Sequence, residues 1–456
     1  MFGNWISILQ SGSYEVSVPT LTASGERIGQ LRGSGQISWS SDSGIRLQGV
    51  TDGAETLNAL FFGPLGTPGR LIPHAEYITF TGRTQNGWDV TTDPTPRDGH
   101  RTHSNLPDVV WDLGMKGMTF RRETTKEAVR ILSILIGPVP QGWPRVTDSE
   151  IHNEFFGHRS SRHDWLATVT RVGRVAARKC SEEWFEVRVL PEEGKPMSDP
   201  FLVCTAIARA FGFVLGRRCV IRGHEEINEN KRTRRLNAQN SKTTRNTLLN
   251  PLGWHLEFLQ NVERFLGQAI DFFVTDLGQQ VATYLYVCWD TADNAHQTQL
   301  AINSICVEGL LRLATSTLGP TQSELAQSDI AAFEEWLKSK PASFTPQFLN
   351  RLGGLTSMFK SLSANEILRD WVNRGVLGVT KEDAKAWSET RNPSAHGQLS
   401  RFESQEELQV LITRHARVQN LLNKIVLRLI GYSGIYIDYS QPGFPPATFR
   451  GAEAQS

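Results

Sequence analysis

The spacing of apolar residues changes near Pro251, and this change constrains the fold more than any other feature of the sequence. Before it, apolar and β-branched residues form short runs separated by glycine, serine and threonine, which is typical of strands. After it, apolar residues recur every three or four positions, which is typical of amphipathic helices. A chain of 456 residues is long enough for two or three domains, each with its own core. We therefore expect an α+β protein with a β-rich domain followed by an all-α bundle.

Residues 1–222 are expected to form a sandwich-like or barrel-like β domain. The dipeptide Asn86-Gly87 lies between two strand-like runs and predicts a tight hairpin. Two helices should interrupt the strands, one from the start signal Asp199-Pro200 to Gly216 and one over 121–136. The expected strands are Tyr77–Thr81, Trp88–Thr91, Val109–Trp111, Trp165–Val172 and Trp184–Leu190.

Residues 223–250 are rich in charged and polar residues and offer few apolar side chains to bury. The stretch favours a basic linker or exposed loop between the two domains. A second interpretation is an electrostatic arm that attracts RNA. The RNA-binding candidates on that interpretation are Lys231, Arg232, Arg234 and Arg235.

Residues 251–456 are expected to form a bundle of four or five helices. The two longest, near 296–317 and 404–430, are the expected central pair, and the apolar stripe on the second equally permits a dimer face. The tail from Tyr432 to Phe449 should pack as an extended strap. The other expected helical stretches are 254–288, 323–339, one or two over 346–374, and one from the N-cap Thr380 to Arg391.

Composition narrows the class of protein. The formal net charge is +1, so contact with RNA would have to come from local patches rather than from overall charge. The five cysteines are scattered and odd in number, which indicates free thiols in a reducing cytosol. The sequence shows neither a secretory signal nor an uninterrupted apolar stretch long enough to span a membrane. We expect a cytoplasmic protein without a membrane partner.

Arg391 and His396 lie five positions apart between two expected helices. The guanidinium is a fixed cationic fork that suits a phosphate, and the imidazole can take or give a proton near neutral pH. RNA carries its own nucleophile, the 2′-hydroxyl. The pair predicts metal-independent RNA cleavage, with Arg391 on the scissile phosphate, His396 as general base or acid, and Asn392 binding substrate or fixing the loop. Pro393 disfavours a helical Asn392, so the helix should end near Arg391.

The motif, with Asn392 after the arginine and Gly397 after the histidine, resembles the R-N-x-x-x-H signature of the HEPN superfamily of ribonucleases. The likeness is greatest to the ApeA-like HEPN domains of bacterial anti-phage defence and covers about residues 250–440. It implies an endoribonuclease that leaves a 2′,3′-cyclic phosphate, uses no cofactor, and joins two motifs in a homodimer or higher homo-oligomer. It also implies an RNA substrate, with transfer RNA as one candidate, a phage-derived trigger, abortive infection, and a sensing or regulatory role for residues 1–222.

Two further residues near the motif have alternative interpretations. Glu308 falls in the middle of the helix expected over 296–317, where a carboxylate either faces solvent or pairs with a cation. By the same resemblance, an acidic residue on this helix points at the motif, so Glu308 is expected to orient Arg391. Trp387, one turn before Arg391, either stacks on a base or belongs to the core, and the core is the favoured interpretation.

Other interpretations remain open on the sequence alone. Arg391 and His396 could do no more than cap carbonyl groups at a helix end. The fold could also be retained without the reaction, as a catalytically silent HEPN-type module that dimerises and binds a nucleotide or a protein. His152, His158 and His163 match no common zinc-site spacing, so no metal site is expected.

Overall fold

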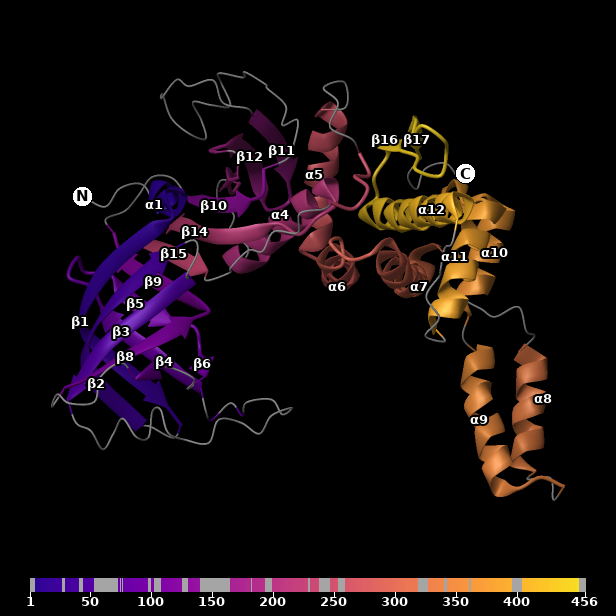
Figure 1. Cartoon of the computed structure of the whole chain (residues 1–456), viewed down its shortest axis with the longest axis horizontal. Coiled ribbons are helices and arrows are strands. Elements are labelled where there is room, and N and C mark those ends of the chain that lie inside the picture. Colours follow the sequence, from indigo (N-terminus) through magenta and orange to yellow (C-terminus); the bar gives the residue numbers. More distant parts are fainter. Residues whose placement is uncertain are drawn as a thin grey trace. The chain divides into compact units, whose positions relative to one another are not determined.

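The computed structural model describes residues 5–26, 29–40, 44–52, 73, 75, 77–96, 100–101, 108–124, 130–139, 165–181, 183–192, 199–228, 230–237, 247–252, 259–318, 327–339, 343–360, 362–395 and 404–450. The chain forms two compact units (Figure 1). The first comprises Met1–Ala208 and Cys219–Thr243, and the second comprises Arg209–Arg218 and Thr244–Ser456. The first boundary falls inside helix α4 (Pro200–Leu215).

The first unit is built on one large antiparallel sheet, and this confirms the expected β-rich first half. The strands are β1 (Ser13–Gly25), β2 (Gly29–Ser40), β3 (Gly44–Asp52), β4 (Tyr77–Arg83), β5 (Asp89–Thr92), β6 (Thr95–Pro96), β7 (His100–Arg101), β8 (Asp108–Met115), β9 (Gly117–Glu123), β10 (Ile131–Gly137), β11 (Trp165–Thr170), β12 (Gly173–Lys179), β13 (Phe185–Leu190), β14 (Val220–Asn228) and β15 (Lys231–Asn237). Their spatial order is β11-β12-β13-β10-β14-β15-β9-β5-β4-β1-β2-β3-β8-β7, with β6 paired to β4 off this path.

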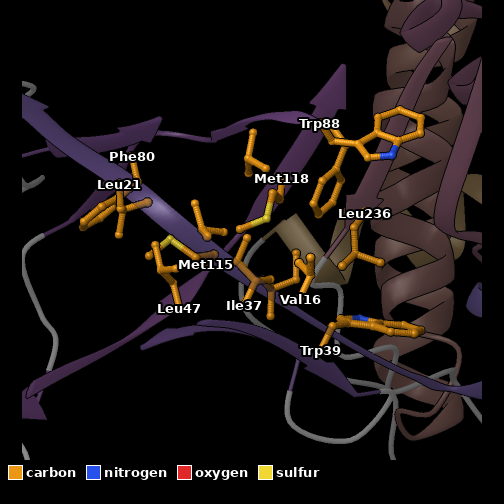
Figure 2. Packing of buried hydrophobic residues seen from close by; sticks show 14 of the residues in the cluster. Val16, Leu21, Ile37, Trp39, Leu47, Phe80, Trp88, Met115, Met118 and Leu236 are labelled. Atoms are coloured by element: carbon orange, nitrogen blue, oxygen red, sulfur yellow. The ribbon is translucent and has the colours of Figure 1, made fainter. Parts of the chain in front are cut away.

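One face of the sheet encloses an apolar core, and helix α1 (Trp5–Ser11) adds Trp5, Ile6 and Leu9 to it. Side chains from strands far apart in the sequence meet in this core, as Figure 2 shows. Strand β1 buries Val16 and Val18, and then Leu21 and Ala23, because a β-bulge between Val18 and Leu21 shifts the pairing with β2. The bulge keeps both halves of the strand facing the core.

The local turn and cap signals of the first unit are confirmed. Strands β4 and β5 pair antiparallel around Asn86-Gly87, and Gly87 has the positive φ of 77° that this turn requires. Helix α4 begins at Pro200, and its C-terminal Gly216 has a φ of 65°.

Two predictions for the first unit are wrong. The stretch 121–136 is not a helix, because it contains the end of β9 and most of β10, with residues 125–129 outside the described part. The apolar run in β10 is buried along almost its whole length between β13 and β14. A fully buried strand of this kind lacks the alternation that separates a strand from a helix.

The predicted basic linker at 223–250 is also wrong over residues 223–237, which form most of β14 and all of β15. These strands lie between β10 and β9, away from both edges of the sheet. Arg234 is buried and donates from Nε to Glu225 on β14 at 2.7 Å, and its guanidinium lies 4.5 Å from the ring centroid of Trp88. Pairing with Glu225 on the neighbouring strand, rather than with solvent, therefore compensates the charge of Arg234. Residues 238–246 lie outside the described part.

The second unit is helical, as expected, but its described part holds eight α-helices besides the end of α4, more than the predicted four or five. Its described elements are the end of α4, α5 (Leu259–Phe273), α6 (Asp276–Asp290), α7 (His296–Leu318), α8 (Gln327–Lys338), α9 (Pro346–Lys360), α10 (Ala364–Arg374), the 3₁₀ turn η3 (Val376–Gly378), α11 (Lys381–Ala395), α12 (Gln405–Ile430), β16 (Gly434–Ile437) and β17 (Pro446–Phe449). Helices α7 and α12 form the largest helix–helix contact, which confirms the expected central pair. Helices α6, α10 and α11 pack on α7, and α8 packs on α9.

The first helical stretch and the tail of the second unit differ from expectation. The helical stretch at 254–288 divides into α5 and α6, because Thr275 has an extended conformation and its hydroxyl caps α6 by accepting from the amide of Gly278. The tail forms a two-stranded hairpin, β16 with β17, rather than a single extended strap. Its loop includes Gly443 and Phe444, both at positive φ.

Candidate active site

Helix α11 begins at a capping box. The backbone amide of Thr380 donates to Asp383 Oδ2 at 3.1 Å, and the amide of Asp383 donates to Thr380 Oγ1 at 3.2 Å. This reciprocal pair confirms the predicted N-cap. Asp383 is buried and also accepts from Arg417 Nη1 of α12 at 2.9 Å. The start of α11 is therefore anchored to α12 as well as capped.

Trp387 belongs to the core, which is the interpretation that the sequence favoured over stacking on a base. Its side chain is 2% exposed, and its Nε1 donates to the backbone carbonyl of Ser304 on α7 at 2.9 Å. A tryptophan in this position cannot stack on a nucleic-acid base without leaving the core. It fixes the rotation of α11 against α7.

Arg391 lies one turn after Trp387 and contacts Glu308, which lies one turn after Ser304. Arg391 Nε donates to Glu308 Oε2 at 2.7 Å, with the side chains 33% and 17% exposed. The sequence raised this pairing as one of two possibilities, and the contact is present. A charge-assisted hydrogen bond of this length restricts the guanidinium while leaving part of it accessible to solvent.

Glu308 has a second cationic partner that sequence reasoning did not single out. Arg312 Nη2 donates to Glu308 Oε1 at 2.8 Å, so each carboxylate oxygen accepts from a different guanidinium. The signal available in the sequence was the i,i+4 spacing of a glutamate followed by an arginine in a helix.

The other residues of the motif are only partly described. His396 lies outside the described residues, and so does the side chain of Asn392. Helix α11 itself runs to Ala395, past the end expected near Arg391, so Pro393 lies in its last turn. The contacts of Trp387 and Arg391 with α7 outweigh the local preference against helix before a proline.

The four basic residues predicted to bind RNA lie in β15 of the first unit, whereas Arg391 and Glu308 lie in the second. Lys231 is exposed at the start of the strand. Arg235 Nη2 pairs with Asp93 Oδ2 at 2.7 Å, and Arg234 is buried against Glu225. Arg232 is half-buried, with Nε 3.9 Å from Glu225 Oε1. Three of the four guanidinium or ammonium groups therefore have structural contacts within the sheet.

A polar cluster between α7 and α12 was not singled out from the sequence. Asn303 is fully buried and donates from Nδ2 to Gln419 Oε1 at 2.8 Å, with His415 Nε2 at 3.4 Å. Burial, with a smaller contribution from the nearby His296, lowers the pKa of His415 to about 4. The ring centroids of the two histidines are 5.6 Å apart. Neutral His415 fits the buried interface between the helices.

Comparison of this chain with protein-family models, with curated proteins and with solved structures found no match. Within the described residues, no group of three or more histidine, cysteine or acidic side chains is arranged to hold a metal ion. His152, His158 and His163 lie outside those residues. No helix in the described part of the chain combines the length and the apolar character that crossing a bilayer requires.

Proposed function

We propose that the second unit is a metal-independent endoribonuclease in which Arg391 and His396 perform the reaction. The observation that carries the proposal is the 2.7 Å contact between Arg391 Nε and Glu308 Oε2. A guanidinium has five N–H donors, and Glu308 holds this one in place while a third of the side chain remains exposed. An oriented cation of this kind suits an anion whose charge increases in the transition state.

In the proposed reaction the 2′-hydroxyl oxygen of RNA attacks the adjacent phosphorus, and the bond from phosphorus to the 5′-oxygen breaks. One imidazole removes the proton of the 2′-hydroxyl, and a proton is returned to the leaving 5′-oxygen. Arg391 binds the non-bridging oxygens, and Asn392 binds substrate or fixes the loop. The products are a 2′,3′-cyclic phosphate and a 5′-hydroxyl, so no water is consumed and no metal is needed.

The resemblance to HEPN ribonucleases extends this proposal to assembly and biological role. Two copies of the chain would bring their motifs together, so that His396 of one protomer acts as base and that of its partner as acid. The first unit would sense or regulate, with a phage-derived trigger and anti-phage defence as the setting. Transfer RNA is one candidate substrate.

The test is incubation of the purified full chain with total RNA in EDTA, with and without lysate from phage-infected cells. Cleavage that leaves 2′,3′-cyclic phosphate ends is expected. His396→Ala should abolish it while the melting temperature is unchanged. His296→Ala is the matched control, because His296 is an exposed histidine at the start of α7.

Arg391→Ala should lower cleavage by about 100-fold or more, the usual effect of removing one group that stabilises transition-state charge. Full activity of His396→Ala would overturn the proposal. RNA binding without cleavage in either condition would instead favour the catalytically silent module that binds a nucleotide or a protein.

A further inference from the structure

Glu308 binds two cationic side chains at once, and these differ in exposure. Arg391 is 33% exposed and comes from α11, whereas Arg312 is 65% exposed and lies one turn after Glu308 on α7 itself. Each guanidinium donates to a different carboxylate oxygen, Oε2 and Oε1 respectively. The two cations are therefore near neighbours that share a single negative charge.

The charge balance of this group favours an additional anion. One carboxylate neutralises one guanidinium, so Arg391, Glu308 and Arg312 together carry a net charge of +1. The more buried Arg391 is already paired with Glu308, and the two guanidinium groups repel each other across it. An anion bound beside them would relieve this repulsion and would meet two sets of planar N–H donors.

The helix register places Arg312 one turn beyond Glu308, in the direction in which α11 runs toward the motif. Ser304 faces Trp387 and Glu308 faces Arg391, so both helices advance by four residues between the two contacts. The next turn of α7 carries Arg312, and the next turn of α11 ends at Ala395. Arg312 therefore lies on the side of α7 that carries Glu308, which contacts α11, rather than on a remote face of the helix.

We propose that Arg312 is an RNA-binding residue of the same site, which holds a phosphate next to the scissile one. The inference depends on the proposed ribonuclease function, since it assigns the substrate contact beyond the bond that is cut. Because Arg312 would contact only the backbone, it contributes affinity and register without reading the base sequence.

Two measurements test this role. The first is binding of a fluorescent single-stranded 2′-O-methyl RNA, which lacks the nucleophile, as a function of salt. Loss of one phosphate contact in Arg312→Ala should weaken binding equally for different sequences and reduce the slope of log K against log salt by about 0.7. The second is cleavage kinetics, in which Arg312→Ala should raise KM and leave kcat close to wild type, and Arg312→Lys should recover part of the affinity.

Arg374→Ala is the matched control, because Arg374 also pairs with an acidic residue four positions earlier, Asp370 on α10, and is 41% exposed. It should change neither the slope nor KM.

If Arg312→Ala matches this control while Arg391→Ala loses cleavage, the role of Arg312 is refuted and the ribonuclease proposal stands. If the wild type does not cleave but Arg312→Ala still reduces the salt slope, the reaction is refuted and the anion site stands. Absence of RNA binding by the wild type overturns both.

Discussion

Trp387 donates its indole N–H to the backbone carbonyl of Ser304, and one turn further along both helices Arg391 donates to Glu308. The two contacts are in register, because they are four positions apart on α7 and four positions apart on α11. A buried aromatic anchor therefore sets the height and rotation at which the guanidinium meets its carboxylate. Because both residues lie on regular helices, Arg391 has less freedom than a loop residue would have.

Replacement of Trp387 by phenylalanine should destabilise the second unit and reduce cleavage together. The variant loses the hydrogen bond to Ser304 and leaves a void in the core, which should cost about 1–3 kcal/mol. Thermal unfolding and initial cleavage rates measure the two effects. Trp336→Phe is the control, because Trp336 is 38% exposed and should change stability by about 0.5 kcal/mol or less. Equal behaviour of the two variants would contradict the anchoring role.

Glu308→Gln should separate RNA affinity from catalysis. The amide keeps the size of the side chain but removes the negative charge between Arg391 and Arg312. RNA should bind more tightly at low salt, because the site gains a net positive charge, while kcat falls by about tenfold or more as Arg391 loses its orientation. Anisotropy titrations and single-turnover cleavage measure these opposite changes. A parallel fall in affinity and rate would indicate that the site has simply been disrupted.

Arg234→Met should damage folding rather than RNA binding. Glu225 is buried and accepts from Arg234 at 2.7 Å, whereas Arg232 Nε lies 3.9 Å away. Removing the nearer guanidinium leaves a buried carboxylate poorly paired, at a cost of about 3–5 kcal/mol. Lys231→Met removes the same charge from an exposed position and should leave the unfolding temperature nearly unchanged. A stable Arg234→Met protein with weakened RNA binding would restore the electrostatic-arm interpretation.

Acid should destabilise both units through one histidine in each whose pKa is lowered by burial. Burial lowers the pKa of His224 and of His415 to about 4, whereas an unfolded histidine titrates near 6.5. Between these values the unfolded chain binds more protons, so the free energy of unfolding falls as the pH falls through the window and is independent of these groups above it. Each residue contributes up to about 3 kcal/mol. Unfolding temperatures from pH 7.5 to 4.5 should therefore decline, and less steeply in His224→Gln or His415→Gln.

The sequence predicted the features whose signals are local. Asn86-Gly87, the Asp199-Pro200 start of α4 and the box of Thr380 and Asp383 each depend on residues within a few positions of one another, and the structure has all three. The central pair of long helices followed equally from a sustained apolar stripe. These elements need no knowledge of the rest of the chain.

The errors arose where distant partners decide the structure. The run from Lys231 to Arg235 has the composition of a solvated segment. Only the pairing of β15 with β14 and β9 brings Glu225 to Arg234 and Asp93 to Arg235. Apolar strand β10 gave no period because its side chains are buried on both faces of the sheet. Arg312 was missed although its i,i+4 spacing from Glu308 is a local signal, because such pairs are common on helix surfaces and the spacing alone does not mark a site.

The position of β14 and β15 in the sheet has a consequence for synthesis of the protein. Strands β1 to β9 lie on one side of this pair and β10 to β13 on the other. The strands that join the two halves are thus the last of the sheet to be translated. Until Asn237 has emerged from the ribosome, each half presents an open edge to the cell, and such edges invite pairing with other chains. Translation beyond residue 237 should therefore mark the point at which the nascent first unit becomes resistant to aggregation.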